Sequence, residues 1–409
     1  MRESANFGFV TSDEGRGYRQ MIEKQFTALL RSFVQDTAPK TEESWNMAEL
    51  QRAAAQQNML PVLAYENKRW RLSTDSEVCR RLDGFLYGAI VGNLNRRVDF
   101  ETLSKEFTVR GIAHMPVKGY YLRKLYPVPE LRTFGDIDML IHREDRQKVH
   151  ELMLSLGYSV KQNWEPTYSY IKGAEYYEIH TSLMDGNLDN RADLKAYFNA
   201  AWQYAEPDDG LRYRPDSDFH FIYTVCHLAK HLYSGGAGLR MYLDIALFMK
   251  NGSARLNMKN IERELAALQL TEFFHTVMNA CGAWFGTECG CLLPPPDEAA
   301  IEKLLCYTLD SDLFGHSRDH AVIKLRNSES KKPAKGKLIC NMLFPPAREI
   351  ESRYTFLQGR RWLLPLAWIV RAVSNFRLIP NRLHSMKSVA ETDIDRVETY
   401  DGFMRRIGL

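Results

Sequence analysis

Apolar residues recur every three or four positions through residues 17–107, and few glycines or prolines interrupt them. Examples of this spacing are Met21, Phe26, Leu29 and Leu30, and further along Leu82, Phe85, Leu86 and Ile90. Because this period matches one face of an α-helix, the pattern predicts a helical N-terminal region. The same reasoning predicts a mainly helical region from about residue 194 onward, with breaks at 207–210, 234–236 and 294–296.

Between these helical regions, short apolar runs indicate strands. Residues 113–117 form a β-like run that ends in a turn at Lys118 and Gly119, before a helical turn at 120–125. Residues 137–141 are typical of a strand buried on both faces, and the helix that follows ends at Gly157. Two aromatic and β-branched runs, 168–171 and 176–181, flank Lys172 and Gly173, which predicts a hairpin.

This order of elements predicts an α+β protein in which a small mixed sheet lies between mainly α-helical N- and C-terminal regions. We expect a helical region over 1–108, an α/β core over 109–200 and a second helical region over 201–409. With 409 residues and a hydrophobic content of 45%, the chain can bury a substantial core.

Two aspartates stand at the open end of the predicted buried strand. Asp136 and Asp138 are two positions apart, so their side chains point to the same face and can hold divalent cations between them. Glu178 and His180 share a face of the second hairpin strand and offer a third carboxylate nearby. An Asp-x-Asp sequence after Gly135 is also typical of a solvated turn, but the buried strand after it favours a metal site.

Several motifs follow one another along the chain: Lys118-Gly119, Leu125-Tyr126-Pro127, Arg132, Asp136-Ile137-Asp138, Gly157-Tyr158, Glu178-Ile179-His180, and a helical pattern with His227, His231, Arg240 and Asp244. This order resembles an uncharacterised family of bacterial nucleotidyltransferases in the DNA polymerase β-like superfamily. The resemblance covers most of the chain from Lys118 on. That superfamily usually carries a Gly-Ser pair after its first strand, where this chain has Lys118, Gly119 and Tyr120.

The resemblance implies a polymerase β-like core that transfers a nucleoside monophosphate from a nucleoside triphosphate to a hydroxyl group and releases pyrophosphate. It implies that Asp136, Asp138 and Glu178 are catalytic and hold two magnesium ions, with manganese as an alternative. The acceptor hydroxyl could belong to a protein, an RNA or a small molecule, and the sequence leaves this open.

Cationic and polar residues around the acidic pair are expected to bind the substrate. Lys118 and Arg132 are candidate partners of the triphosphate, although each could instead form a structural ion pair. Gly119 would let backbone amides approach the phosphates. The full set of expected substrate-binding residues is Lys118, Gly119, Arg132, His180, His227, His231 and Arg240.

His220, His227 and His231 are seven and four positions apart, which places them on one side of a predicted helix. The sequence HLAKH could supply two zinc ligands, but it lacks the glutamate of the zinc-protease motif. We therefore expect these histidines to line a cleft or to be hydrogen-bonded between helices. Arg240 and Asp244, four positions apart, could pair with each other or contact the substrate.

Two other functions fit parts of the pattern. A glycosyltransferase could use Asp-x-Asp to hold a metal and a nucleotide-sugar diphosphate, but such folds need alternating strands and helices before the motif. This chain is mainly helical there. A catalytically inactive nucleotide-binding or regulatory protein that retains the fold would also fit, since the Gly-Ser pair is missing.

Composition and a few sequence features indicate the cellular compartment. A net charge of +3 predicts no general attraction to nucleic acid or acidic membranes. The seven cysteines are odd in number and scattered, as is typical of reduced thiols in the cytoplasm. The first residues lack the features of a signal sequence, and the longest apolar run, 362–370, is too short to cross a bilayer. We therefore expect a cytoplasmic protein without a membrane span.

Overall fold

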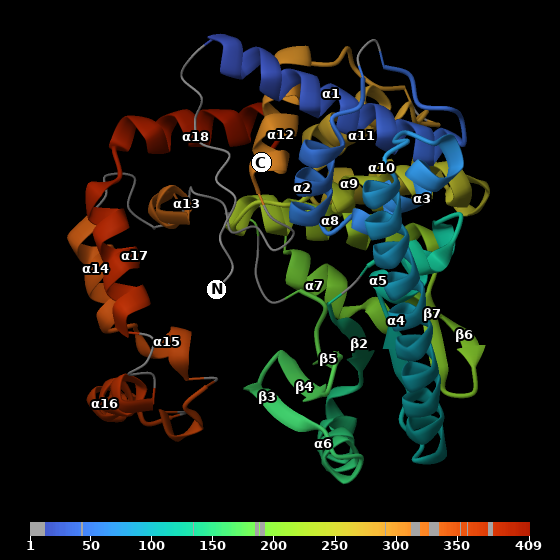
Figure 1. Ribbon diagram of the computed structural model, residues 1–409. Helices are drawn as coiled ribbons and strands as arrows, with labels where there is room; N and C mark the ends of the chain where they lie inside the picture. Colours follow the sequence, from blue (N-terminus) through green and yellow to red (C-terminus); the bar gives the residue numbers. More distant parts are fainter. Residues whose placement is uncertain are drawn as a thin grey trace.

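A seven-stranded mixed sheet forms the centre of the fold in a computed structural model, with strand order β3-β4-β5-β2-β1-β7-β6 (Figure 1). The structure describes residues 13–41, 44–133, 135–184, 188, 193–290, 292–311, 320–326, 335–351, 353–357, 359–374 and 379–409. The strands are β1 (His114–Pro116), β2 (Ile137–Ile141), β3 (Ser159–Trp164), β4 (Thr167–Lys172), β5 (Glu175–His180), β6 (Ala205–Asp209) and β7 (Arg212–Pro215).

The central strand β2 pairs antiparallel with β1 and parallel with β5. In the second pairing Asp138 lies opposite Glu178, and Leu140 lies opposite His180. Residues directly opposite on paired strands have neighbouring side chains on the same face of the sheet. The sheet register therefore brings the third carboxylate next to the aspartate pair.

Helices precede, interrupt and follow the strands. Before β1 come α1 (Asp13–Gln35), α2 (Met47–Gln56), α3 (Leu60–Trp70) and α4 (Ser76–Val109). Between β1 and β3 come α5 (Gly119–Leu122), η1 (Arg123–Leu125), η2 (Pro129–Leu131), η3 (Arg143–Asp145) and α6 (Arg146–Ser155). The predicted N-terminal helices and the helix after the buried strand are thus confirmed.

The chain after β5 is mainly helical, as expected. Around the last two strands lie α7 (Leu194–Asn199), η4 (Ala201–Tyr204), α8 (Ser217–Ser234), α9 (Leu239–Gly252), η5 (Ser253–Arg255), α10 (Met258–Ala267), α11 (Thr271–Phe285) and α12 (Glu298–Asp310). The remaining elements are α13 (His320–Arg326), α14 (Lys335–Leu343), α15 (Ala347–Ile350), η6 (Thr355–Leu357), η7 (Arg361–Leu363), α16 (Leu364–Ser374), α17 (Ile379–Glu391) and α18 (Ile394–Arg406).

The two faces of the sheet pack against different helices. Ile137, Met139 and Ile141 of β2 share a buried cluster with α4 and α6 on one face. Leu140 belongs to the larger cluster on the other face, which includes α1, α3, α8, α9 and α11. Because side chains alternate along a strand, Asp138 shares the face of Leu140 and points toward the larger helical body. This alternation aims the acidic pair at α8 and α9.

The α+β fold class and the predicted hairpin are confirmed, whereas three strands were missed. The strand β3 was not predicted, because it is a largely exposed edge strand without an alternating apolar pattern. The break expected at 207–210 between helices instead contains the last three residues of β6 and the start of the turn to β7. Since β7 pairs with β1, the sheet continues beyond residue 200, where the sequence analysis ends the core. The three-part division of the chain remains a proposal.

Among the described residues, no helix combines the length and apolar character that a bilayer crossing requires. The described cysteines form no disulfide.

Candidate active site

A cavity of about 360 Å³ lies where β2 and β5 face α8 and α9. All ten residues that the sequence analysis singled out for catalysis or binding line it: Lys118, Gly119, Arg132, Asp136, Asp138, Glu178, His180, His227, His231 and Arg240. They come from segments more than a hundred residues apart, and the fold brings them together.

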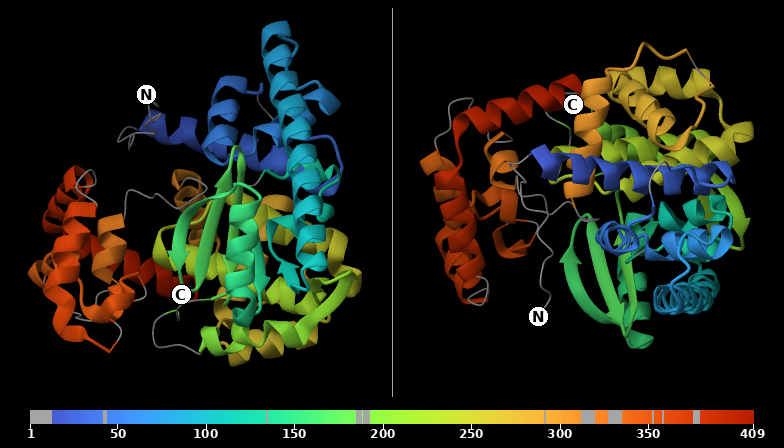
Figure 2. Two further views of the ribbon diagram at one scale, coloured as in Figure 1. Left: turned by 90° about the horizontal axis from the view of Figure 1, so that it is seen from below. Right: turned by 45° about the horizontal axis from the view of Figure 1, so that its top comes forward.

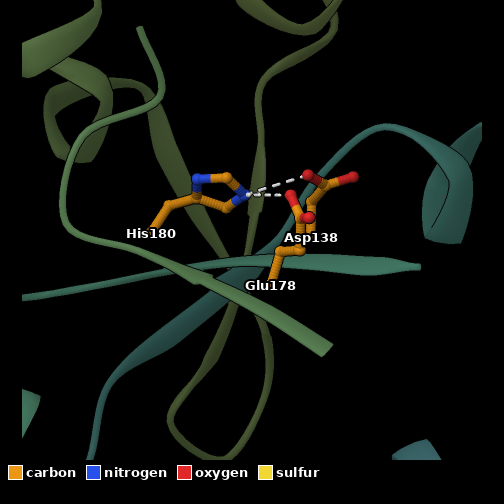
Figure 3. A group of neighbouring side chains, drawn as sticks. All are labelled: Asp138, Glu178 and His180. Atoms are coloured by element: carbon orange, nitrogen blue, oxygen red, sulfur yellow. Dashed lines mark hydrogen bonds and ion pairs between the residues drawn. The ribbon is translucent and has the colours of Figure 1, made fainter. Parts of the chain in front are cut away.

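Asp138, Glu178 and His180 line this cavity and form a compact group (Figure 3). The His180 Nε2 atom lies 2.9 Å from Asp138 Oδ1 and 3.7 Å from Glu178 Oε2. One ligand atom from each residue lies within 4.8 Å of the other two. Two carboxylates and an imidazole at this separation suit a divalent cation. Asp136, one strand position before β2, lines the same cavity.

His180 is hydrogen-bonded on both sides of its ring. Its Nδ1 lies 3.1 Å from the Thr167 hydroxyl oxygen, and its Nε2 lies within hydrogen-bond distance of Asp138. If Nε2 donates its proton to Asp138, Nδ1 accepts from the hydroxyl, so Thr167 would select the tautomer. His180, an expected substrate-binding residue, is thus hydrogen-bonded to side chains of the neighbouring strands β2 and β4.

Lys118 forms an ion pair with the same aspartate. Its Nζ lies 2.7 Å from Asp138 Oδ1. The backbone of Lys118 has φ of +48°, a conformation that non-glycine residues rarely adopt. Hydrogen bonds on both sides fix it, from Val117 N to the Asp138 carbonyl and from Leu122 N to the Lys118 carbonyl. A lysine at a position that favours glycine indicates that its side chain is needed there.

Burial and neighbouring charges shift the pKa values of the carboxyl groups in the cavity in opposite directions. Burial alone would raise the pKa of Asp138, but the Lys118 ammonium and the His180 hydrogen bond outweigh it and hold that pKa well below its usual range. Burial and then the Asp138 carboxylate raise the pKa of Asp136. Burial, Asp138 and Asp136 likewise raise the pKa of Glu178. The lining of the cavity has as many lysine and arginine side chains as carboxylates, but Asp136, Asp138 and Glu178 gather around the single ammonium of Lys118, which makes this acidic group suitable for a further cation.

Arg132 is buried in an ion pair with Asp244 of α9. Its Nε lies 2.8 Å from Asp244 Oδ1 and its Nη2 lies 2.7 Å from Oδ2, while the Tyr126 hydroxyl donates to the same Oδ1 at 2.8 Å. This two-bond geometry is the strong form of an arginine-carboxylate pair. A pair between Arg240 and Asp244 was one of two alternatives expected from the sequence. In the structure, the partners of the Asp244 carboxylate are instead Arg132 and Tyr126. Arg132 thus joins the segment before β2 to α9.

Gly119 leaves room for this arginine. A Cβ atom on Gly119 would lie 2.5 Å from Arg132 Nη1, closer than side-chain atoms approach each other. The four-residue helix α5 that begins at Gly119 is too short to act as an anion site of its own. The lack of a side chain at this position therefore has a packing reason, which differs from the phosphate contact that the sequence suggested.

Arg240 also points into the cavity, but it has no carboxylate partner among the described residues. Its Nη1 donates to the carbonyl and hydroxyl oxygens of Thr133. Burial, and then the nearby Arg132 guanidinium, lower the pKa of Arg240 to about 10. The Asp244 and Asp136 carboxylates partly offset this effect, and Arg240 Nε is buried without a hydrogen-bond partner in the described chain, so an acceptor in the cavity would stabilise the guanidinium.

The three histidines of α8 lie in two different cavities. His227 and His231 lie in the cavity with their Nε2 atoms 3.0 Å apart, and burial lowers the pKa of His231 to about 4 and that of His227 well below its usual value. Both rings are therefore neutral near pH 7. His220 lines another cavity, against the rings of Tyr121 and Phe248. The metal-capable group of the described chain contains none of these three histidines.

Two cavity residues of α8, Thr224 and Lys230, were not predicted. Thr224 precedes His227 by three positions, and Lys230 precedes His231 by one. The helical spacing of Thr224 from His227 could have identified it. Lys230 had no comparable pattern, because adjacent helical positions do not normally share a face.

Gly119→Ala should destabilise the protein, because the new methyl group meets a guanidinium that two hydrogen bonds to Asp244 hold in place. We expect the free energy of unfolding to fall by about 1–3 kcal/mol. Gly84→Ala in α4 is the control, since a Cβ there meets open space and alanine favours a helix. Equal stability of the two variants in urea denaturation would contradict this packing.

Asp136→Asn and Asp138→Asn should change the stability of the metal-free protein in opposite directions. Because the folded pKa of Asp136 is raised, its charge opposes folding at neutral pH, and this cost disappears as the pH falls through that pKa. Because the folded pKa of Asp138 is lowered, its charge supports folding above the unfolded pKa of about 3.9, and the support is lost as the pH falls toward the folded value.

At neutral pH in the presence of a chelator, we therefore expect Asp136→Asn to raise the free energy of unfolding by about 1 kcal/mol. Asp138→Asn should lower it by about 3 kcal/mol, because it leaves the Lys118 ammonium without its partner. Urea denaturation of both variants measures these changes. If the free energy of unfolding changes with the same sign in both variants, the pKa values of the two carboxyl groups are not shifted in opposite directions.

Comparison with known proteins places the chain in a family. A solved structure similar to part of it is that of the antibiotic-resistance factor ANT(2'')-Ia, at 12% identity over 44% of this chain and 91% of that chain. The TM-score is 0.30, too low to support an argument. None of the curated proteins matches the sequence. Residues 43–286, more than half of the chain, match the model of a family described as uncharacterised nucleotidyltransferases, so this protein belongs to that nucleotidyltransferase family.

Proposed function

We propose that this protein is a metal-dependent nucleotidyltransferase that moves a nucleoside monophosphate from a nucleoside triphosphate to a hydroxyl acceptor and releases pyrophosphate. Family membership supports nucleotidyl transfer in general. The observation that carries the finer proposal is the cavity in which Asp136, Asp138 and Glu178 meet the cations Lys118 and Arg240.

The donor set fits magnesium, with manganese as the alternative. Asp136, Asp138 and Glu178 supply carboxylate oxygens, the ligands that both ions prefer, and His180 is close enough to join them or to orient Asp138. When bound, two such ions would lower the pKa of the acceptor hydroxyl and stabilise the charge of the departing pyrophosphate.

The protein's own cations would hold the triphosphate. Lys118 now neutralises Asp138, and its ammonium can turn to a phosphate oxygen once that carboxylate has another partner. Arg240 faces the cavity without an ion-pair partner among the described residues and can bind a second phosphate. The neutral rings of His227 and His231 can add hydrogen bonds without adding charge. Arg132 would act indirectly, by fixing the segment that carries Asp136.

The hydroxyl oxygen of the acceptor would then attack the α-phosphorus while the bond to pyrophosphate breaks. Positioning and charge neutralisation supply most of the catalysis in such reactions. The acceptor, whether protein, RNA or small molecule, and a cytoplasmic location remain parts of this proposal. The fold does not favour a glycosyltransferase, because every described element before β1 is a helix.

Alanine substitution of Asp136, Asp138 or Glu178 should lower pyrophosphate release from nucleoside triphosphates by at least about a hundredfold. The matched control is Glu151→Ala, which removes an exposed carboxylate of α6 outside the cavity. A screen of the four nucleoside triphosphates with magnesium, against mixed hydroxyl acceptors, measures the rate. If the wild-type protein binds nucleoside triphosphate but releases no pyrophosphate, the alternative of an inactive nucleotide-binding protein holds instead.

Arg240→Gln should weaken triphosphate binding more than it slows the chemical step. Loss of one charge-assisted hydrogen bond of about 1.5–3 kcal/mol corresponds to a KM increase of roughly ten- to a hundredfold. Arg263→Gln on the exposed face of α10 should leave KM unchanged. If instead kcat falls and KM stays constant, Arg240 does not hold the ground-state triphosphate.

A further inference from the structure

Positive charge is concentrated in residues 335–391, the segment that contains the helices α14 to α17 and that we call the basic lobe. Residues 335–391 contain ten lysines and arginines but only three glutamates. Because the whole chain has a net charge of only +3, the remainder is net negative. Figures 1 and 2 show these helices grouped at one side of the molecule, where Arg353 lies over the Trp164 ring at the end of β3. The small net charge therefore averages a basic lobe and an acidic body.

Within this lobe, one face of α16 presents apolar side chains to solvent. Leu366, Ile369, Val370 and Val373 follow the i, i+3, i+4, i+7 pattern of a single helix face, and Trp362 stands four positions before the first of them. Trp362 is 77% exposed, Ile369 61% and Val373 70%. Single exposed aliphatic residues are ordinary, but a continuous row of them marks an interaction surface. We call these five residues the α16 stripe.

The opposite face of α16 is firmly packed, so the stripe does not result from a detached helix. Ala367 is buried, and Trp368 Nε1 donates to the Pro345 carbonyl at 2.9 Å. Arg371 Nη1 donates to the Met342 carbonyl at the end of α14. The helix is thus held with its apolar stripe outward.

Two exposed arginines, Arg360 and Arg361, directly precede Trp362. A tryptophan beside cationic residues at the start of an amphipathic helix is the arrangement that lies in the headgroup region of a bilayer. The tryptophan ring and the aliphatic chains enter the boundary of the acyl chains, while the arginines pair with lipid phosphates and carboxylates.

We propose that the α16 stripe and its flanking arginines bind the surface of a membrane that contains anionic lipids. With 11 residues, α16 is far shorter than a membrane span and would lie in the plane of the interface. A nucleic acid would bind the cations but would leave the aliphatic row in water. A second copy of the lobe would be repelled by its like charge. An anionic bilayer matches both the charge and the apolar row.

This proposal differs from what the net charge alone predicts, which is no attraction to acidic membranes. It is independent of the proposed nucleotidyl transfer, because none of the stripe residues lines the catalytic cavity. Variants of the stripe should therefore leave pyrophosphate release unchanged.

Flotation of the full-length protein with vesicles tests the proposal. We expect binding to vesicles of phosphatidylcholine with phosphatidylserine, much weaker binding to phosphatidylcholine alone, and weakening by salt. Ile369→Ser with Val373→Ser should lower the partition coefficient for the anionic vesicles by at least about tenfold. Arg360→Gln with Arg361→Gln should lower it for the anionic vesicles only.

The matched control is Leu94→Ser with Val98→Ser on α4, two exposed apolar residues that are also four positions apart. It should bind anionic vesicles as the wild type does. Trp362→Ser gives a second test outside α16, and thermal unfolding checks that each variant is folded. The proposal is overturned if the wild type does not bind, if the Ile369 and Val373 pair binds unchanged, or if the control pair loses binding equally. If the Ile369 and Val373 variant binds unchanged, the protein is attracted to the vesicles by charge alone. A nucleic acid would attract the lobe in the same way.

Discussion

The parallel pairing of β2 with β5 is the constraint on which the site depends. It sets Asp138 opposite Glu178 and so forces two carboxylates together on the face that meets α8 and α9. Such a concentration of buried negative charge is unfavourable unless cations balance it. Lys118 supplies one cation in a backbone conformation that is itself costly, and His180 supplies a hydrogen bond to the same carboxylate. The fold thus holds Asp138 between an ammonium and an imidazole, with Asp136 and Glu178 beside it in a group that a divalent cation would stabilise.

The helices on that face complete the site in two different ways. Asp244 of α9 holds Arg132 and thereby the segment before β2, so it acts as a structural anchor. Arg240, one helical turn earlier, has no carboxylate partner in the described chain and faces the cavity. The same helix therefore provides one buried ion pair, with Arg132, and one guanidinium that faces the cavity without such a pair in the described chain. This division supports the proposal that a cavity rich in acids also accepts a triphosphate.

The sequence was sufficient to predict which acidic residues lie together in the cavity. The apolar run of β2 and the two-residue spacing of Asp136 and Asp138 have short-range causes, so they can be recognised without tertiary information. The hairpin pattern placed Glu178 on a neighbouring strand, and the family resemblance added the residues of α8 and α9. The partner of Arg132 could not be chosen in advance, because Arg240 is closer to Asp244 in sequence while Arg132 is closer in space. The polar strands β3 and β6 were missed because edge strands need no alternating apolar pattern.

Family membership supports nucleotidyl transfer in general, and our assignment of that reaction to particular atoms rests on the geometry of the acidic group. A crystal structure of the protein soaked with manganese and a non-hydrolysable nucleoside triphosphate would examine this geometry directly. We expect anomalous density for manganese in contact with Asp136, Asp138 and Glu178, the triphosphate beside Arg240, and Lys118 turned away from Asp138. Manganese density elsewhere, or a triphosphate bound outside this cavity while Lys118 still contacts Asp138, would contradict the assignment of the site.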